Sequence, residues 1–207
     1  MGDAHITLDM SEEGVFDEYV TERLGRMVYG SNMIEIAGGS LNTTLQLCRP
    51  IFRGAGISEE DVAKMDPDGV YRTCNVRCGS HVFMDESRVP FEMRDMIASL
   101  ESDIQEATEK GEIDSVVLAS KYCHRFVNIH PFGDGNGRMC RLILNTLLLK
   151  YGGDIVCIGQ DEADRREYLR IAVNASAVGA SQNQQDAIME NYRELALFTL
   201  RHARAWV

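Results

Sequence analysis

The residues best suited to chemistry lie in one segment of twelve residues, HPFGDGNGRMCR, which begins at His130 and ends at Arg141. A histidine exchanges a proton near neutral pH, so His130 is a candidate general base. Asp134 offers carboxylate oxygens, which suit Mg²⁺ when substrate phosphates complete the coordination. Arg138 and Arg141 supply two fixed positive charges on the helix that follows. These residue types together predict a site for a substrate that carries phosphate groups.

Alternating glycines in the same segment favour an anion-binding backbone; they are Gly133, Gly135 and Gly137. Because glycine adopts positive φ readily, we expect the backbone N–H groups of this stretch to turn toward one point at the start of the following helix. A helix N-terminus attracts anions through its unpaired N–H groups and its dipole. We also expect Arg138 and Arg141 to project from one helix face toward the same anion, since an unpaired buried charge is costly.

The segment resembles the motif of the Fic family, H-x-F-x-(D/E)-G-N-G-R-x-x-R, at all eight specified positions. The resemblance implies an all-α Fic-type helical bundle that transfers AMP from Mg-ATP to Ser, Thr or Tyr hydroxyls of target proteins. It implies that His130 deprotonates the hydroxyl, that Phe132 anchors the loop in the core and that Asp134 holds Mg²⁺. It assigns the phosphates to the remaining motif residues, which are Gly135, Asn136, Gly137, Arg138 and Arg141.

A second pattern lies upstream, where Ser31 to Glu35 fit the first five positions of the family's inhibitory pattern, (S/T)-x-x-x-E-(G/N). Ile36 stands where the pattern has glycine or asparagine. The resemblance implies that Glu35 pairs with Arg141 and occupies the seat of the γ-phosphate. The chain is then autoinhibited by Glu35.

The same residues also have a purely structural interpretation. Asn32 and Glu35 fit a capping box at a helix start, in which side chains satisfy the first backbone N–H groups. In either case we expect a separate helix over residues 31–37, because Gly30 interrupts the helical pattern before it.

The spacing of apolar residues predicts an all-α fold that carries one small β-hairpin. Helices are expected at residues 11–29, 31–37, 41–52, 89–106, 113–127, 137–151, 162–173 and 186–206, with a short one from Ser58. Residues 137–151 are apolar nearly all round, which predicts a helix buried at the centre of the bundle. Residues 70–83 contain β-branched residues and a Gly79–Ser80 turn, which predict the hairpin. The resemblance makes this hairpin a flap that pairs with the backbone of the target.

Composition limits the classes of partner and location. The formal net charge is −11, from 21 basic and 32 acidic residues, and such a surface repels nucleic acid. No apolar stretch approaches the ~20 residues that span a bilayer, and the first residues lack a signal-peptide pattern. We therefore expect a single cytoplasmic domain over residues 1–207, with free cysteine thiols and no membrane contact. The resemblance leaves a homodimer open.

The resemblance also leaves the exact reaction open. The alternatives are transfer of UMP, phosphate or phosphocholine, removal of AMP with Glu35 positioning water, and nucleotide binding without turnover. The complete set of His130, Asp134 and both arginines favours an enzyme. Tyr168 and Asn174 lie where related proteins often contact adenosine, and core or surface roles for both residues are left open as well.

Overall fold

The computed structural model describes residues 10–54, 71–78, 81–178 and 192–204. Within these ranges the chain forms α-helices, one 3-10 turn and one two-stranded hairpin, which confirms the predicted fold class. The helices are α1 (Met10–Ile34), α2 (Leu41–Phe52), α4 (Val89–Lys110), α5 (Ser115–Ile129), α6 (Asn136–Gly152), α7 (Glu162–Val178) and α9 (Arg193–Arg204). The predicted helix from Ser58 lies outside the described residues.

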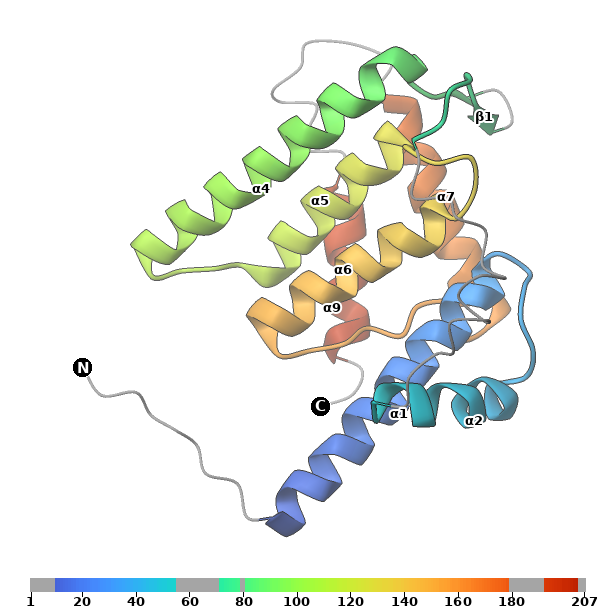
Figure 1. The fold of residues 1–207 in the computed structure, drawn as a ribbon, viewed down its shortest axis with the longest axis vertical. Helices are drawn as coiled ribbons and strands as arrows, with labels where there is room; N and C mark the ends of the chain where they lie inside the picture. Colours follow the sequence, from blue (N-terminus) through green and yellow to red (C-terminus); the bar gives the residue numbers. More distant parts are fainter. Residues whose placement is uncertain (1–9, 55–70, 79–80, 179–191, 205–207) are drawn as a thin grey trace.

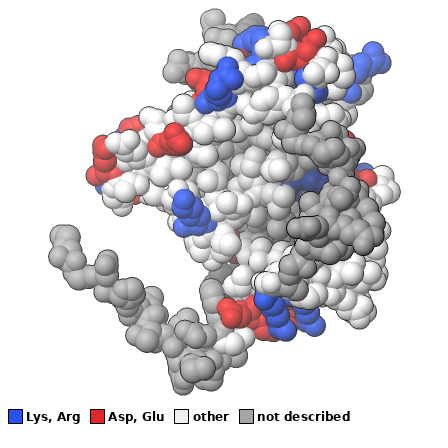
Figure 2. Space-filling view, viewed as in Figure 1, with Lys and Arg blue, Asp and Glu red and all other residues white. Residues whose placement is uncertain are grey.

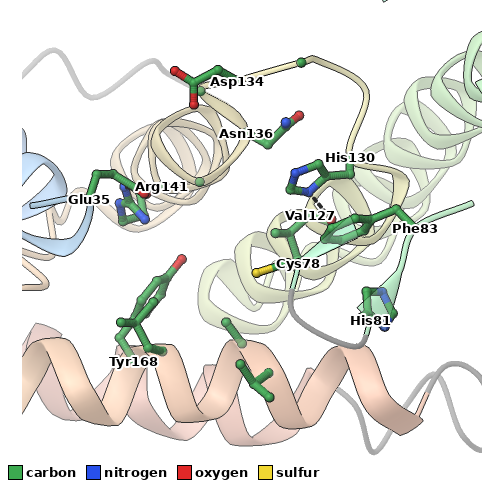
Figure 3. Close-up of a pocket in the computed structure, with 16 residues that line it drawn as sticks. Glu35, Cys78, His81, Phe83, Val127, His130, Asp134, Asn136, Arg141 and Tyr168 are labelled. Carbon is green, nitrogen blue, oxygen red and sulfur yellow. Dashed lines mark hydrogen bonds and ion pairs between the residues drawn. The ribbon is translucent and has the colours of Figure 1, made fainter. Parts of the chain in front are cut away.

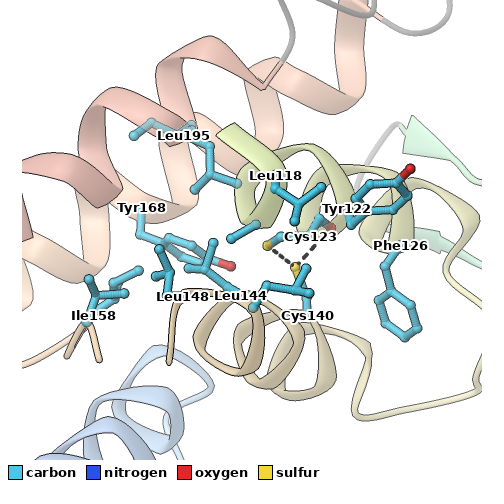
Figure 4. Packing of buried hydrophobic residues seen from close by; sticks show 14 of the residues in the cluster. Leu118, Tyr122, Cys123, Phe126, Cys140, Leu144, Leu148, Ile158, Tyr168 and Leu195 are labelled. Carbon is cyan, nitrogen blue, oxygen red and sulfur yellow. Dashed lines mark hydrogen bonds between the residues drawn. The ribbon is translucent and has the colours of Figure 1, made fainter. Parts of the chain in front are cut away.

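Helix α5 lies at the centre of the arrangement and packs against α4, α6 and α9 (Figure 1). In that view α4, α5 and α6 run side by side with α9 behind them. Helix α2 packs against α1. The core fills the space between these helices, and Figure 4 shows Tyr122, Cys123, Cys140 and Leu144 within it. Cys123 and Cys140 are free thiols, as are the other four cysteines.

Local capping accounts for several helix boundaries. The Asp114 side chain accepts a hydrogen bond from the N–H of Val117 at 2.9 Å and so starts α5. Gly111 ends α4 in the left-handed conformation, at φ 73°. Helix α2 begins and ends at the predicted residues, with Ser40 as its N-cap.

Helix α6 is buried on one face only, so the prediction of complete burial for residues 137–151 is wrong. Leu144 and Leu148 are buried against α5, whereas Leu142 is 44% exposed and Leu149 is 40% exposed. Single exposed leucines are common on soluble proteins, so apolar composition alone did not separate the two faces.

The predicted break at Gly30 is also wrong, because α1 continues without interruption to Ile34. Gly30 allows close packing of two backbones: a Cβ at this position would collide with the carbonyl oxygen of Ile158. Nε of Arg165 donates to the carbonyl of Ile34 at 3.0 Å and fixes the same end of α1. In the segment predicted as a separate helix over residues 31–37, residues 31–34 are therefore the last turn of a long helix, and residues 35–37 follow its end.

The hairpin is confirmed but is shorter than predicted. Strand β1 (Arg77–Cys78) pairs antiparallel with β2 (His81–Val82), and the N–H of Phe83 donates to the carbonyl of Val76 at 3.1 Å. The 3-10 turn η1 (Glu86–Arg88) then leads into α4. The Gly79–Ser80 turn lies outside the described residues.

Charged side chains on the face drawn in Figure 2 lie in small separate groups, some of both signs and some of one sign. Ion pairs between exposed side chains include Lys110 with Glu106 and Arg201 with Glu167. In the described part of the chain, no helix combines the length and the apolar character needed to cross a membrane.

Candidate active site

A pocket of about 630 Å³ opens between the α5–α6 loop, the hairpin and α7 (Figure 3). Its size suits a small-molecule ligand. The motif contributes seven of its lining residues, which are His130, Gly133, Asp134, Gly135, Asn136, Gly137 and Arg141. Glu35 reaches the same pocket from the end of α1. The structure thus brings the two sequence patterns together at one site.

His130 is the C-terminal cap of α5 and adopts the left-handed conformation, with φ 51° and ψ 60°. Its ring Nδ1 lies 3.2 Å from the carbonyl oxygen of Val127. A carbonyl oxygen only accepts hydrogen bonds, so this contact places the proton on Nδ1 and leaves Nε2 as the proton acceptor. The Phe83 ring stacks on the imidazole at a centroid distance of 3.7 Å.

The environment of His130 favours its neutral form. Burial lowers the pKa of the imidazole below its ordinary value, and the positive charges of Arg72 and His81 lower it further. The contact with the Val127 carbonyl acts in the opposite direction but does not outweigh burial. His130 is therefore neutral at pH 7 and fits the predicted role of a general base.

The loop after His130 is held by the side chain of Asn136. Its Oδ1 accepts from the N–H of Phe132 at 3.0 Å, and its Nδ2 donates to the Phe132 carbonyl at 2.8 Å. The Phe132 ring packs against Tyr71 and Phe126, which confirms its anchoring role. The Asn136 side chain therefore shapes the loop.

Only one of the three motif glycines has a positive φ, contrary to the prediction. Gly135 caps the N-terminus of α6 at φ 79°, whereas Gly133 and Gly137 are absent from the positive-φ glycines of the described residues. The first turn of α6 nevertheless lies at the pocket, because Gly135 to Gly137 line it. The unpaired N–H groups of that turn are therefore available to a ligand in the pocket. The helix N-terminus remains a candidate anion site.

The two motif arginines do not face a common partner, contrary to the prediction. Arg138 pairs with Asp134 at 2.9 Å, and the Asp134 side chain is 92% exposed at the pocket rim. Arg141 has a side chain only 3% exposed and contacts the end of α1. The α6 helix thus directs one guanidinium to the surface and one into the pocket.

The last turn of α1 binds Arg141 through three contacts. Its Nε donates to Oγ of Ser31 at 2.9 Å, and its Nη2 donates to the Ser31 carbonyl at 3.0 Å and to Oε1 of Glu35 at 2.7 Å. The guanidinium also lies 5.6 Å from the Tyr168 ring centroid. The Glu35–Arg141 pairing predicted from the inhibitory pattern is confirmed.

The Glu35 carboxylate also lies against the start of α6. A Cβ at Gly137 would collide with Oε1 of Glu35, so the glycine makes room for this oxygen. A carboxylate at a helix N-terminus is electrostatically favourable. Glu35 thus occupies the position that an anionic ligand of α6 would take.

The capping-box interpretation is wrong, because Asn32 and Glu35 lie at a helix end. The N–H of Ala37 donates to the carbonyl of Asn32 at 2.9 Å, and the N–H of Ile36 donates to that of Met33 at 3.1 Å. This pair of bonds is the Schellman motif, in which the first residue past the C-cap is left-handed. Ile36 occupies that position at φ 55°.

We expect Ile36→Asn to raise the free energy of unfolding by about 1 kcal/mol, because a β-branched residue is strained at positive φ. Ile36 is 81% exposed, so little apolar burial is lost. Thermal unfolding of both proteins measures the difference. Ile51→Asn, on an exposed face of α2, is the matched control and should not stabilise. An unchanged or lower melting temperature for Ile36→Asn would contradict the strain.

Sequence reasoning missed the apolar wall of the pocket. It is formed mainly by one face of α7 and by α5, through Val127, Tyr168, Leu169, Ala172 and Val173. Of the two predicted adenosine contacts, Tyr168 lines the pocket, whereas Asn174 is exposed and is not among the lining residues. The apolar residues of α7 are spaced as in any amphipathic helix, so the sequence carried no separate signal that they line a pocket.

A sequence model of the Fic/DOC family matches residues 52–148. A Fido domain-containing protein of Dictyostelium discoideum is 36% identical over 106 residues, which cover 51% of this chain and 71% of that protein. A protein adenylyltransferase Fic of Aedes aegypti is 44% identical over 58 residues, which cover 28% of this chain but only 12% of the mosquito protein.

Solved structures show the same fold at lower identity. A Fic family protein of Desulfovibrio desulfuricans superposes with a TM-score of 0.61 at 20% identity, covering 95% of this chain and 69% of that one. A Fic domain containing signaling protein of Bacteroides thetaiotaomicron gives a TM-score of 0.53, covering 88% and 69%. The family model and the Dictyostelium relative, together with the complete motif around the pocket, show that the chain belongs to the Fic/DOC family.

Proposed function

We propose that this protein is an adenylyltransferase that moves AMP from Mg-ATP to Ser, Thr or Tyr hydroxyls of target proteins. The observation that carries the proposal is the arrangement of His130 and Arg141 in one pocket, on either side of the α6 N-terminus (Figure 3). A neutral base and an anion seat are the two groups that transfer of a phosphate ester to a hydroxyl requires. The relatives named protein adenylyltransferase support the same class.

In the proposed reaction Nε2 of His130 accepts the proton of the target hydroxyl. The hydroxyl oxygen forms a bond to the α-phosphorus of ATP, and the bond from that phosphorus to the bridging oxygen breaks. Pyrophosphate leaves with the negative charge, which the α6 N-terminus and Arg141 stabilise. Catalysis rests mainly on positioning and electrostatics.

The donor set fits Mg²⁺ bound jointly with phosphates. Asp134 is a carboxylate at the pocket rim, and its partner Arg138 is itself 46% exposed. Exposed ion pairs contribute little stability, so the carboxylate is available to a metal. The described residues contain no group of three His, Cys, Asp or Glu side chains able to hold a metal. Mg²⁺ keeps several waters and needs only one or two carboxylates, and it would neutralise charge on the phosphates.

Asp134→Ala should remove the metal dependence of ATP binding, because Asp134 is the only carboxylate of the motif loop. Thermal unfolding with ATP, with and without Mg²⁺, measures this dependence. Saturation at a hundredfold excess over Kd should stabilise the wild type by about 2.7 kcal/mol. Asp95→Ala, which removes an exposed carboxylate of α4, is the control. Equal Mg²⁺ dependence in Asp134→Ala and wild type would contradict the metal role.

We propose further that the resting protein is autoinhibited. The Glu35 carboxylate accepts a hydrogen bond from Arg141 and lies against Gly137, so it competes with the terminal phosphate for both.

The hairpin edge would hold the target protein, whose backbone would add a strand beside β1 and β2.

Two labelled forms of ATP test the proposed reaction. Protein should acquire label from ATP labelled at the α-phosphate and none from ATP labelled at the γ-phosphate. Label from the γ-position alone would indicate phosphate transfer instead. No label from either, in a protein that binds Mg-ATP and carries Glu35→Gly, would indicate a nucleotide-binding protein without turnover.

A further inference from the structure

Arg72 is a buried arginine, 6% exposed, that binds the backbone around His130. Its own N–H donates to the carbonyl of Pro131 at 2.9 Å, and its Nε donates to the carbonyl of His130 at 2.8 Å. Its Nη2 lies 3.5 Å from the carbonyl oxygen of Ile129. One residue therefore contacts three consecutive carbonyls, centred on the left-handed His130.

The same guanidinium binds the hairpin from both sides. Nη1 donates to the carbonyl of Cys74 before β1 at 2.9 Å, and Nη2 donates to the carbonyl of Met84 after β2 at 2.5 Å. The planar fork of an arginine offers five N–H donors in fixed directions, which lysine cannot reproduce. Arg72 thus joins the two ends of the hairpin to the loop that carries the candidate base.

This connection also sets the position of Phe83. Phe83 follows β2 directly and lies next to Met84, whose carbonyl Arg72 binds. Its ring stacks on the His130 imidazole, and its other neighbour is the His81 ring at 4.7 Å, edge to face. The imidazole is therefore held between the Val127 carbonyl and the Phe83 ring.

We propose that Arg72 is a positioning residue for the reaction, which holds His130 in its left-handed conformation and docks the hairpin on the imidazole. The inference rests on the proposed function, in which His130 is the base. A non-glycine residue at positive φ costs free energy and persists only where surrounding contacts hold it. Loss of the Arg72 fork releases both the backbone at His130 and the stacked ring.

The charge of Arg72 has a separate effect that provides an independent measurement. Burial is the largest cause of the lowered pKa of the His130 ring. Among the described residues, the charged or titratable groups that act on this ring are Arg72 and His81, and both lower its pKa further. Asp85, on the turn after β2, interacts electrostatically with Arg72. Removing the guanidinium should therefore raise the pKa of His130, whereas lysine should keep the pKa low.

The test compares Arg72→Met and Arg72→Lys in the Glu35→Gly background. Arg72→Met should lower the rate of AMP labelling by about 10²-fold, with the Kd for Mg-ATP within about twofold, because misplacing a reacting group by ~1 Å costs that much. Arg72→Lys should recover part of the rate and keep the pH profile of the parent. The pKa of His130, followed by NMR and assigned with His130→Ala, should rise in Arg72→Met only.

Arg23→Lys is the matched control. Arg23 is another buried arginine that binds a backbone carbonyl, that of Ile155, away from the pocket. The Arg23→Lys substitution should lower the free energy of unfolding without changing the labelling rate or the His130 pKa. Parental labelling rates in both Arg72 variants would overturn the proposal, whatever the pKa of His130. If Arg72→Met does not fold, a parental labelling rate in Arg72→Lys overturns it.

Failure of the proposed function is distinguishable from failure of this inference. A Glu35→Gly parent that binds Mg-ATP but takes no label from the α-phosphate removes the adenylyltransferase assignment. The NMR shifts of the His130 ring, measured above its pKa where the ring is neutral, then still decide the role of Arg72, because they report the stacked Phe83 ring. Shifts that change in Arg72→Met and not in Arg23→Lys support positioning, and shifts that stay unchanged in both overturn it.

Discussion

Replacing Glu35 by glycine should raise AMP labelling by roughly 10- to 100-fold, because in the proposed autoinhibition the Glu35–Arg141 contact keeps most of the protein in a state that cannot seat the γ-phosphate. Arg141 is bonded to Glu35 at 2.7 Å, and the same carboxylate oxygen lies against Gly137 at the start of α6. Removing the carboxylate frees both anion-binding groups at once. Initial labelling rates at matched protein concentration measure the change.

The same substitution should lower the stability of the protein without nucleotide. The Arg141 side chain is 3% exposed and keeps its contacts with Ser31, so the loss should be about 1–3 kcal/mol. Mg-ATP should restore much of this stability, because the phosphates replace the lost carboxylate. The labelling rate of Glu35→Gln, which keeps a hydrogen-bond acceptor without the charge, should lie between those of the wild type and Glu35→Gly.

Glu22→Gln is the matched control for the charge change. It removes another carboxylate from α1, paired with Arg26 at 2.8 Å on the surface. We expect it to leave labelling unchanged. Labelling in Glu35→Gly that equals or falls below wild type would leave Glu35 with a structural role only.

Replacing His130 by alanine should abolish transfer while leaving Mg-ATP binding largely intact. Loss of a general base costs on the order of 10²–10⁴ in rate. The binding groups, the α6 N-terminus and Arg141, remain in place on a different element. Labelling in the Glu35→Gly background and the Kd for Mg-ATP separate the two effects.

His124→Ala is the control for this second substitution. His124 lies on α5, where its Nε2 is 3.0 Å from Nδ2 of Asn128. It is not among the residues that line the pocket, so its removal should not affect transfer. The depressed pKa of His130 adds a pH criterion. The folded protein should keep the neutral base, and hence its activity, below the ordinary histidine pKa of about 6.5. Wild-type labelling by His130→Ala would show that another group accepts the proton.

Much of the site followed from the sequence because its residues are close together in the chain. His130, Asp134 and Arg141 lie within one loop and one helix, and their spacing fixes a shared location. The Glu35–Arg141 contact spans 106 positions and was accessible only through the resemblance to the inhibitory pattern. Residue types alone could not have paired them.

The errors arose where a residue's surroundings decided its role. Gly30 has the composition of a helix break, but it serves as the contact point between α1 and the Ile158 backbone. Arg138 and Arg141 are three positions apart but have different partners. Arg138 pairs with the exposed Asp134 at the surface. Arg141 is buried and binds Ser31 and Glu35. Arg72 gave no local signal, because its partners are carbonyls, which every residue has.

The most direct measurement is peptide mass spectrometry of the Glu35→Gly protein after incubation with Mg-ATP, alongside the Glu35→Gly/His130→Ala protein. Transfer of AMP predicts a Ser, Thr or Tyr peptide that gains the mass of one adenylyl group in the first protein and none in the second. Peptides that gain only a phosphate, or an adenylyl group that persists without His130, would contradict the proposed function.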